Sequence, residues 1–222
     1  MQAASCLDAV GFVLAGGESR RMGTDKALVE LGGRPLIAHA IGILAAAGVP
    51  AFIAGTRPEA RAQLEVFAPL LPDVQAGLGP LGGVCTALAS TSAKLAMFLP
   101  VDAPLLPASL VAYLLRHACV TDASITIASV NGVPQTFPAV VARRALPALE
   151  RELREGRLGC LAGFRAAARE GGESLSIVTA ETLAQSGHVS HPESLPVTSW
   201  FVNLNTRRDV LAAAARRASC II

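Results

Sequence analysis

The sequence has few aromatic residues, almost no net charge and no long apolar run. Aromatic residues make up 4% of the 222 positions while apolar residues make up 52%, so alanine, valine and leucine must fill the core. The formal net charge is +2, which is too balanced for a protein whose main partner is nucleic acid. No apolar stretch approaches the roughly 20 residues of a membrane span. We therefore expect neither nucleic acid nor a membrane among its partners.

The cysteines also lack any pairing pattern. The five of them, Cys6, Cys85, Cys119, Cys160 and Cys220, are scattered, and none belongs to a C-x-x-C motif. This pattern indicates reduced thiols in a cytoplasmic protein rather than a metal site or a disulfide framework. The N-terminus has no basic segment ahead of an apolar one, so we expect no signal peptide. Cys220 stands third from the end rather than fourth, so we expect no prenyl anchor.

Apolar periodicity predicts alternating strands and helices along the chain. Buried strands are expected at 9–15, 50–54, 94–99, 124–129 and 138–142, with a short extended piece at 27–31. Helices are expected at 36–47, 59–67, 81–90, 108–118, 143–154 and 158–169. This order is typical of an α/β domain with a mostly parallel, Rossmann-like sheet and right-handed crossovers. The length fits one domain over residues 1–222.

Glycines and cations follow the first predicted strand. Gly16 and Gly17 remove two β-carbons where the chain leaves the strand, so backbone N–H groups can approach a ligand closely. Arg20, Arg21 and Lys26 come within ten positions and predict an anionic ligand such as a phosphate. The P-loop pattern and the G-x-G-x-x-G fingerprint are both absent, which excludes an ordinary P-loop ATPase or NAD enzyme. A plain glycine turn with a solvated charged loop remains the alternative.

A carboxylate follows the strand predicted at 94–99, in the segment Pro100-Val101-Asp102-Ala103-Pro104. A side chain at the carboxyl end of a parallel strand faces the crevice where α/β sheets bind ligands. An ionised Asp is a suitable ligand for Mg²⁺ when water and phosphate oxygens supply the other positions. The alternative is that Asp102 caps a turn. Residues 71–83 are rich in glycine and proline, which is typical of a loop with room for a flat ligand. Taken alone, a plain turn-rich connection is the alternative for this stretch.

Two asparagines end the informative part of the sequence. Alternation along an extended chain places Asn203 and Asn205 on the same side. Asn205 alternatively caps the closing helix together with Thr206, since Asp209 falls in the first turn of that helix.

The spacing of these motifs resembles that of a known family. Leu14-Ala15-Gly16-Gly17, Ser19, Arg21-Met22-Gly23 and Asp25-Lys26 match the L-A-G-G-x-S-x-R-M-G-x-D-K signature of nucleotidyltransferases like the molybdenum cofactor guanylyltransferases. Further along, 79–83 resembles the family's G-P-L-x-G, 100–104 its P-x-D-x-P and 201–206 its F-x-N-x-N-T. The last of these matches implies that residues 200–206 end a final strand. The resemblance runs in order over nearly the whole chain. The related cytidylyltransferases usually begin with L-A-A-G, so Gly16-Gly17 favours the guanylyl branch.

The resemblance implies a single nucleotidyltransferase domain, three-layered α/β/α and similar to the nucleotide-diphospho-sugar transferases. Its N-terminal half would bind the nucleotide and its C-terminal half the acceptor. The implied reaction transfers GMP from GTP to molybdopterin and releases pyrophosphate, with Mg²⁺ as cofactor. Molybdoenzyme maturation proteins are further partners that the resemblance suggests, and we expect a monomer or a weak homo-oligomer.

The resemblance also assigns roles to individual residues. It makes Arg21, Lys26 and Asp102 catalytic, with Asp102 also the metal ligand. The nucleotide-binding set that it implies is Leu14, Ala15, Gly16, Gly17, Lys26, Asp73, Gly79, Pro80, Leu81 and Asp102. Asn203 and Asn205 are assigned to the acceptor side.

One position departs from the family pattern. Relatives often carry an asparagine after the second strand, where this chain has Ala54-Gly55-Thr56. Thr56 is a polar substitute, but the change leaves selectivity for guanine over cytosine open. Transfer of CMP to molybdopterin, or nucleotidyl transfer to another phosphorylated acceptor, is therefore an alternative function. A nucleotide-binding partner protein without chemistry is an alternative of another class.

Overall fold

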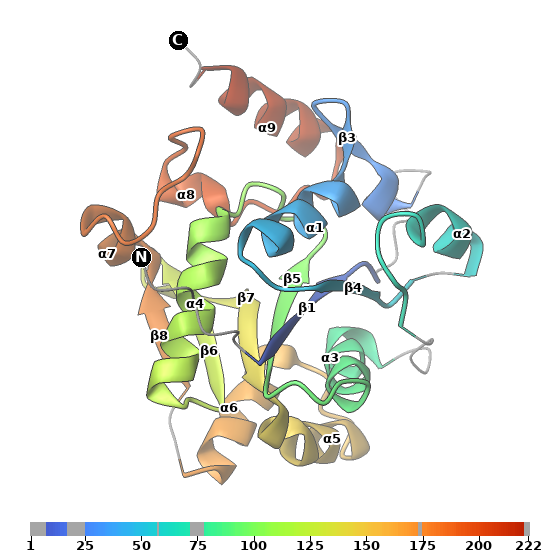
Figure 1. Cartoon of the computed structure of the whole chain (residues 1–222), viewed down its shortest axis with the longest axis vertical. Coiled ribbons are helices and arrows are strands. Elements are labelled where there is room, and N and C mark those ends of the chain that lie inside the picture. The colour runs from blue at the N-terminus through green and yellow to red at the C-terminus, as the bar shows by residue number, and fades with distance from the viewer. Residues whose placement is uncertain (1–7, 17–24, 57, 72–77, 173–174, 220–222) are drawn as a thin grey trace.

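The chain folds around one six-stranded sheet in a computed structural model (Figure 1), which describes residues 8–16, 25–56, 58–71, 78–172 and 175–219. The strand order is β4 (Ala51–Ala54), β1 (Ala9–Leu14), β5 (Leu95–Pro100), β7 (Val133–Ala142), β6 (Ile125–Val130) and β8 (Ser176–Thr179). Neighbouring strands pair in parallel except where β7 runs against β5 and β6. The predicted mostly parallel α/β sheet is confirmed.

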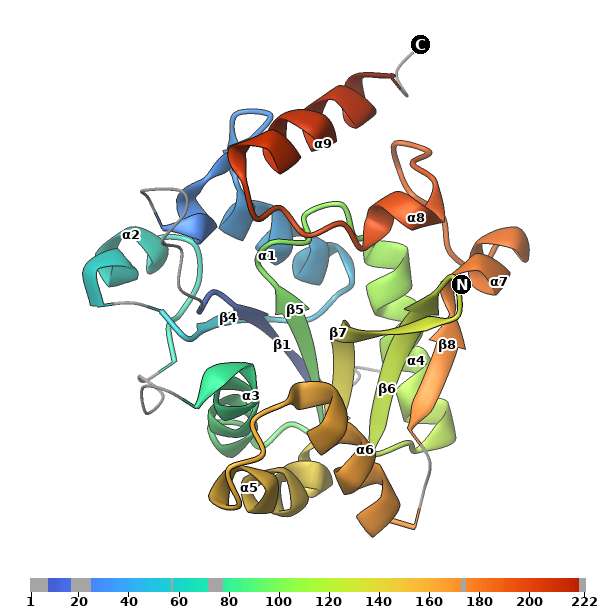
Figure 2. The same cartoon turned by 180° about the vertical axis from the view of Figure 1, so that it is seen from behind.

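Two layers of helices cover the sheet, as Figures 1 and 2 show from opposite sides. One face packs against α1 (Leu36–Ala46) and α4 (Ala108–Thr121). The other packs against α3 (Gly79–Ala89), α5 (Leu146–Arg154) and α6 (Cys160–Glu170). The shorter elements are η1 (Lys26–Leu28), the hairpin β2 (Glu30–Leu31) and β3 (Arg34–Pro35), η2 (Pro58–Ala60), α2 (Arg61–Leu64), η3 (Arg143–Ala145), α7 (Ala180–Gln185) and α8 (Val197–Trp200). Helix α9 (Arg207–Ser219) closes the described chain.

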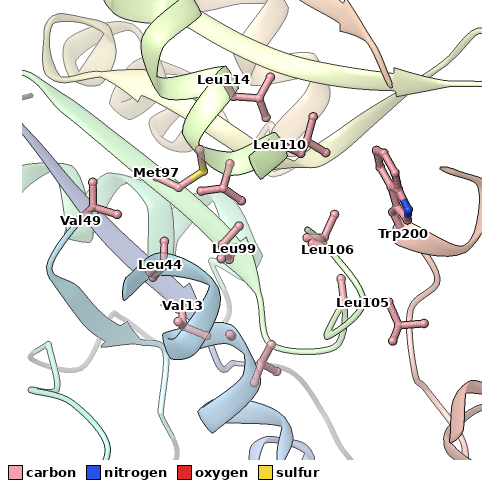
Figure 3. Close-up of a cluster of buried hydrophobic side chains, with 14 of the residues drawn as sticks. Val13, Leu44, Val49, Met97, Leu99, Leu105, Leu106, Leu110, Leu114 and Trp200 are labelled. Carbon is pink, nitrogen blue, oxygen red and sulfur yellow. The ribbon is translucent and has the colours of Figure 1, made fainter. Parts of the chain in front are cut away.

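Side chains alternate between the two cores along each central strand. Val13 on β1 and Met97 and Leu99 on β5 point toward α1 and α4, where they meet Leu44 and Leu110 (Figure 3). Burying such aliphatic side chains contributes about 1.5–3 kcal/mol each before the loss of chain entropy is counted. The prediction that aliphatic residues fill the core therefore holds on this face.

Phenylalanine rings pack together in the opposite core. Phe12 of β1 and Phe98 of β5 lie side by side with ring centroids 5.5 Å apart, and Phe52 of β4 lies 5.9 Å from Phe12. Phe164 of α6 is fully buried in the same cluster. These rings span three adjacent parallel strands and so help to fix their register.

The predicted strand at 200–206 is wrong. The helical turn α8 ends at Trp200, and residues 201–206 have turn and irregular backbone. The indole Nε1 of the buried Trp200 donates to the carbonyl of Leu195 (2.8 Å). The extended piece expected at 27–31 is a 3₁₀ turn followed by the two-residue strand β2. The structure adds an edge strand, β8, in the polar stretch where none was predicted. None of the helices in the described ranges combines the length and apolar character that a membrane crossing requires.

Candidate functional site

The carboxyl ends of β4, β1 and β5 are joined into one surface. The amide of Ala15 donates to the carbonyl of Ala54 (2.9 Å), and the amide of Val101 donates to the carbonyl of Leu14 (3.2 Å). The ladder thus continues past the strands. In parallel α/β sheets, ligands bind at this edge.

Gly16 and Gly55 bring two backbone segments into direct contact at this edge. A Cβ on Gly16 would lie 2.8 Å from the carbonyl oxygen of Gly55, closer than such atoms approach in proteins. Gly55 has a φ of +76°, and a Cβ there would lie 3.2 Å from the amide nitrogen of Gly16. Gly16 is therefore required for packing against the residue that follows β4, which is a reason that the sequence motif did not reveal.

Lys26 and Asp102 meet at the same edge although they are far apart in the sequence. Asp102 follows β5 in a turn, and Lys26 begins the 3₁₀ turn η1, which Asp25 caps by accepting from the amide of Ala27 (2.9 Å). The Lys26 ammonium nitrogen lies 2.6 Å from Oδ2 of Asp102. Each side chain is 20% exposed, so the pair is partly desolvated and still reachable from solvent.

The segment that precedes α9 completes this cluster. The amide of Leu204 donates to the carbonyl of Asp102 (2.8 Å), and Oδ1 of Asn205 accepts from the Lys26 ammonium (2.5 Å). Residues from three distant parts of the chain therefore surround one ammonium group.

Asp209 and Thr206 form the cap of α9, leaving the Asn205 side chain to Lys26. The Asp209 carboxylate accepts from the amides of Asn205 (2.9 Å) and Thr206 (2.7 Å), and the Thr206 hydroxyl accepts from the amide of Asp209 (3.2 Å). These hydrogen bonds hold the pKa of Asp209 below its usual range. The bond with the Thr206 hydroxyl has the largest effect, and the bonds from the two amides come next. Two roles were expected for Asn205, a contact at the site and a cap of the closing helix. Its side chain makes the contact at the site, and only its backbone takes part in the cap.

The start of α3 supplies the predicted G-P-L positions. Gly79 and Pro80 are exposed, and the first helical hydrogen bond runs from the amide of Gly82 to Leu78 (3.2 Å). The amide groups before Gly82 are free of the helical ladder, as at any helix N-terminus. Leu81 is different, because its side chain is fully buried and approaches Gly163 of α6. Its side chain belongs to the core, so only its backbone remains for a ligand.

Comparison with known proteins decides the family. The MobA-like NTP transferase domain matches residues 11–174, which is more than half of the chain. The chain belongs to the MobA-like NTP transferase family. A molybdenum cofactor guanylyltransferase of Shewanella halifaxensis is 42% identical over 125 residues, covering 55% of this chain and 61% of that protein. One of Xanthomonas euvesicatoria is 42% identical over 115 residues, covering 50% of this chain and 57% of that protein. The matches thus span about three fifths of these relatives' length.

Solved structures show the same fold. Molybdopterin-guanine dinucleotide biosynthesis protein A of Archaeoglobus fulgidus superposes with a TM-score of 0.74 at 20% identity, over 94% of this chain and 98% of that one. A CMP:2-keto-3-deoxy-manno-octonic acid synthetase in complex with CTP gives a TM-score of 0.68 at 14% identity, over 95% of this chain and 98% of that one. At these identities the likeness concerns the fold alone.

Several residues of the family motifs are not placed. Gly17, Arg20, Arg21 and Asp73 lie outside the described residues, so their predicted roles remain predictions. Asn203 is exposed, two positions before Asn205. Leu14 is half-buried, and its side chain lies 3.6 Å from where a Cβ on Gly83 of α3 would stand.

Thr56 stands at the position where the sequence departs from the family pattern. It is 8% exposed, and its hydroxyl oxygen has no hydrogen-bond partner within the described ranges. A buried hydroxyl without a partner costs about 1–3 kcal/mol. Thr56 lies just beyond β4, so this unsatisfied hydroxyl is at the same sheet edge as Gly16.

A second polar cluster near the site was not foreseen from the sequence. It surrounds a hollow of about 220 Å³ between α1, α9 and the segment from Pro104 to Ala108. Its polar lining residues are Arg34, His39, His191, Glu193 and Arg217. They come from separate segments with no recognisable spacing, which is why no motif signalled them.

The polar groups of this second cluster are bonded to one another or to backbone. Arg217 Nε donates to both carboxylate oxygens of Glu193 (2.8 and 3.0 Å), and these bonds lower the pKa of Glu193. His39 Nε2 lies 3.0 Å from the carbonyl of Leu31, and His191 Nδ1 accepts from the amide of Glu193 (3.0 Å). Burial lowers the pKa of both histidines. We interpret the cluster as a set of contacts that hold α9 in place.

The described chain holds no cluster of three or more His, Cys, Asp or Glu side chains that would enclose a metal. Asp102 presents a carboxylate at the sheet edge, and its side chain is partly open to solvent. This arrangement fits Mg²⁺ rather than zinc, because Mg²⁺ keeps water ligands and commonly binds through one or two carboxylates together with substrate phosphates.

Proposed function

We propose that the protein transfers GMP from GTP to molybdopterin with release of pyrophosphate. The observation that carries this proposal is the contact of Lys26 with Asp102 at the sheet edge, within a family whose similar members are named molybdenum cofactor guanylyltransferases. A paired ammonium and carboxylate beside closely packed glycine backbone suit a polyphosphate. The proposed division is a nucleotide site in the N-terminal half and an acceptor site in the C-terminal half.

In the proposed reaction, a phosphate oxygen of the acceptor bonds to the α-phosphorus of GTP. The bond between the α-phosphorus and its bridging oxygen breaks, and pyrophosphate leaves with the electron pair. An acceptor phosphate is already ionised at neutral pH, so no protein base is required. Catalysis then depends on alignment and on stabilisation of negative charge.

Each described site residue has a role in this proposal. The Lys26 ammonium neutralises charge that develops on the departing phosphates. Asp102 would hold Mg²⁺, which when bound supplies a Lewis acid for phosphate oxygens. Asn205 holds the Lys26 ammonium from the acceptor side. Arg21 is proposed to assist Lys26, and Gly16, Gly17, Gly79 and Pro80 to line the nucleotide with backbone.

A coupled pyrophosphatase assay with molybdopterin and either GTP or CTP tests the proposal. We expect phosphate release with GTP, and Asp102→Asn should lower the rate by about a thousand-fold or more, since the charge at the metal ligand is worth several kcal/mol. The matched control is Asp122→Asn. Asp122 is an exposed carboxylate at the end of α4, paired with Arg144 on the surface, and its loss should leave the rate unchanged.

The outcomes separate the alternatives. Turnover with CTP alone would support the cytidylyl alternative that the sequence at Ala54-Gly55-Thr56 leaves open. Nucleotide binding without turnover of either substrate would support a non-catalytic partner protein. Either result would refute guanylyl transfer.

A further inference from the structure

The carboxylate assigned to the metal already has a cationic partner. Lys26 Nζ lies 2.6 Å from Oδ2 of Asp102, and both side chains are four-fifths buried. An ammonium and a divalent cation at the same carboxylate oxygen repel each other, and partial burial strengthens that repulsion because water screens it less. The contact seen here is therefore incompatible with full cation binding at that oxygen.

Lys26 also has a second, uncharged acceptor. Oδ1 of Asn205 lies 2.5 Å from the ammonium. Asn205 is held in place from two sides, because the neighbouring Leu204 amide bonds to the Asp102 carbonyl and its own amide bonds to Asp209. The flexible four-carbon stem of lysine allows the ammonium to leave Asp102 while it keeps the bond to Asn205.

We propose that Lys26 is the built-in counter-ion of Asp102, which a divalent cation with its nucleotide displaces, and that Asn205 is the positioning residue that retains the freed ammonium beside the phosphates. This inference rests on the proposed function, because it takes Asp102 as the metal ligand. It has one direct consequence. The ligand-free protein binds a bare divalent cation weakly, and the triphosphate strengthens that binding by offering Lys26 another anionic partner.

Binding of Mn²⁺ to the ligand-free full chain, followed by electron paramagnetic resonance, tests the counter-ion role. Lys26→Met should bind Mn²⁺ at least about ten-fold more tightly than the unaltered protein, since it removes a competing unit charge in a partly buried contact. Lys94→Met is the matched control, because Lys94 is the only other lysine, is exposed and precedes β5 at the opposite end of the strand. It should leave the affinity unchanged.

Two failures of this experiment have different meanings. If Lys26→Met binds Mn²⁺ no more tightly than the unaltered protein, while Asp102→Asn still weakens binding in the Lys26→Met background, the counter-ion role is wrong and the metal assignment stands. If Asp102→Asn has no effect on Mn²⁺ binding in either background, the metal assignment in the proposed function is wrong as well. Pyrophosphate release is measured separately and does not enter this comparison.

The role of Asn205 has its own readout. Lysine labelled with ¹³C at the ε-carbon gives two signals in this protein, one each from Lys26 and Lys94. On addition of Mg²⁺ with a non-hydrolysable GTP analogue, the Lys26 signal should shift while the Lys94 signal stays. In Asn205→Ala, the Lys26 signal of the nucleotide-bound protein should have the narrow line width of a mobile side chain. In Asn205→Asp, its line width should return to that of the unaltered protein. A nucleotide-bound Lys26 signal that is the same with and without the Asn205 side chain would overturn this role.

Discussion

Gly16 and Gly55 show at the scale of single residues how closely packing and binding are combined at the sheet edge. From the sequence alone, the glycine at position 16 predicted that a ligand approaches the backbone closely. The structure adds that the backbone of Gly55, the residue after β4, occupies the space where a Gly16 side chain would stand. Gly55 is 39 positions further along the chain, and the glycine motif itself carries no information about it.

Gly16→Ala should destabilise the protein by about 1–3 kcal/mol, because its Cβ meets a backbone carbonyl that cannot rotate away. Gly83→Ala is the matched control. Gly83 lies inside α3, and its Cβ would lie 3.6 Å from Leu14, an ordinary contact, so alanine should be neutral or stabilising by up to about 1 kcal/mol. Urea unfolding measures both. Equal midpoints for the two variants would contradict the packing argument.

Other residues of the site differ in how far the sequence could predict them. Lys26 and Asp102 were both expected at strand tips of one parallel sheet, and the general rule for such sheets was enough to bring them together. The burial of the Leu81 side chain depends on Gly163, whose position the fold alone determines. Arg21 and Asp73 stay predictions, since both lie outside the described residues.

The segment between α8 and α9 shows the limits of prediction at the scale of elements. Its alternation of polar and apolar residues is compatible with a strand, and the exposure of Asn203 and Asn205 around the buried Leu204 follows that alternation. The segment nevertheless bonds to the Asp102 loop and to Lys26 instead of a sheet neighbour. Local pattern predicted which side chains share a side and could not predict their partners.

The ion pair of Arg217 and Glu193 holds helix α9 in place, and its two side chains are 30% and 26% exposed. Arg217→Ala should lower the stability by about 1–2 kcal/mol, since charge-assisted bonds of this kind are stronger than neutral ones. Arg151→Ala is the control, because its pair with Glu170 is 49% and 46% exposed and should be worth at most about 0.5 kcal/mol.

Hydrogen exchange gives the element-level readout for these two variants. In Arg217→Ala, the amides of α9 should exchange faster while those of β1 and β5 keep their rates. Unchanged exchange in α9 would show that the ion pair does not hold this helix, and our interpretation of the second cluster would be wrong.

The titration of the second cluster should be visible in the stability of the whole molecule. Burial, and then the charges of Arg34 and Arg217, lower the pKa of His39 below its ordinary value. Burial and Arg217 lower the pKa of His191 in the same way, although Glu193 opposes the shift. A depressed histidine pKa in the folded state means that the unfolded chain binds protons first as pH falls.

The free energy of unfolding should therefore decrease as pH is lowered from 7.5 to 5.5. Urea unfolding across this range measures the slope. His39→Gln and His191→Gln should each make this slope shallower, because each removes a histidine whose pKa is lowered in the folded state. A flat profile, or a slope that both cluster variants leave intact, would show that these histidines do not set it. The lowered pKa values of Glu152, Glu193 and Asp209 act in more acidic solution.

At the scale of the whole molecule, the sequence predicted the sheet and its two helical layers well. Apolar runs marked β1, β4, β5 and β6 within one or two residues of their ends. It missed the first half of β7 and all of β8. Their exposed or half-buried residues carry little apolar signal, and β8 is defined by pairing with β6, which is remote in the chain.

In the proposed function, three distant segments of the chain, represented by Lys26, Asp102 and Asn205, bind one nucleotide together. A crystal structure with GTP and Mg²⁺ tests this most directly. We predict Mg²⁺ on the Asp102 carboxylate, the Lys26 ammonium on a phosphate oxygen, and the Asn205 amide oxygen still bonded to that ammonium. A nucleotide bound elsewhere, with Lys26 and Asp102 still paired to each other, would contradict it.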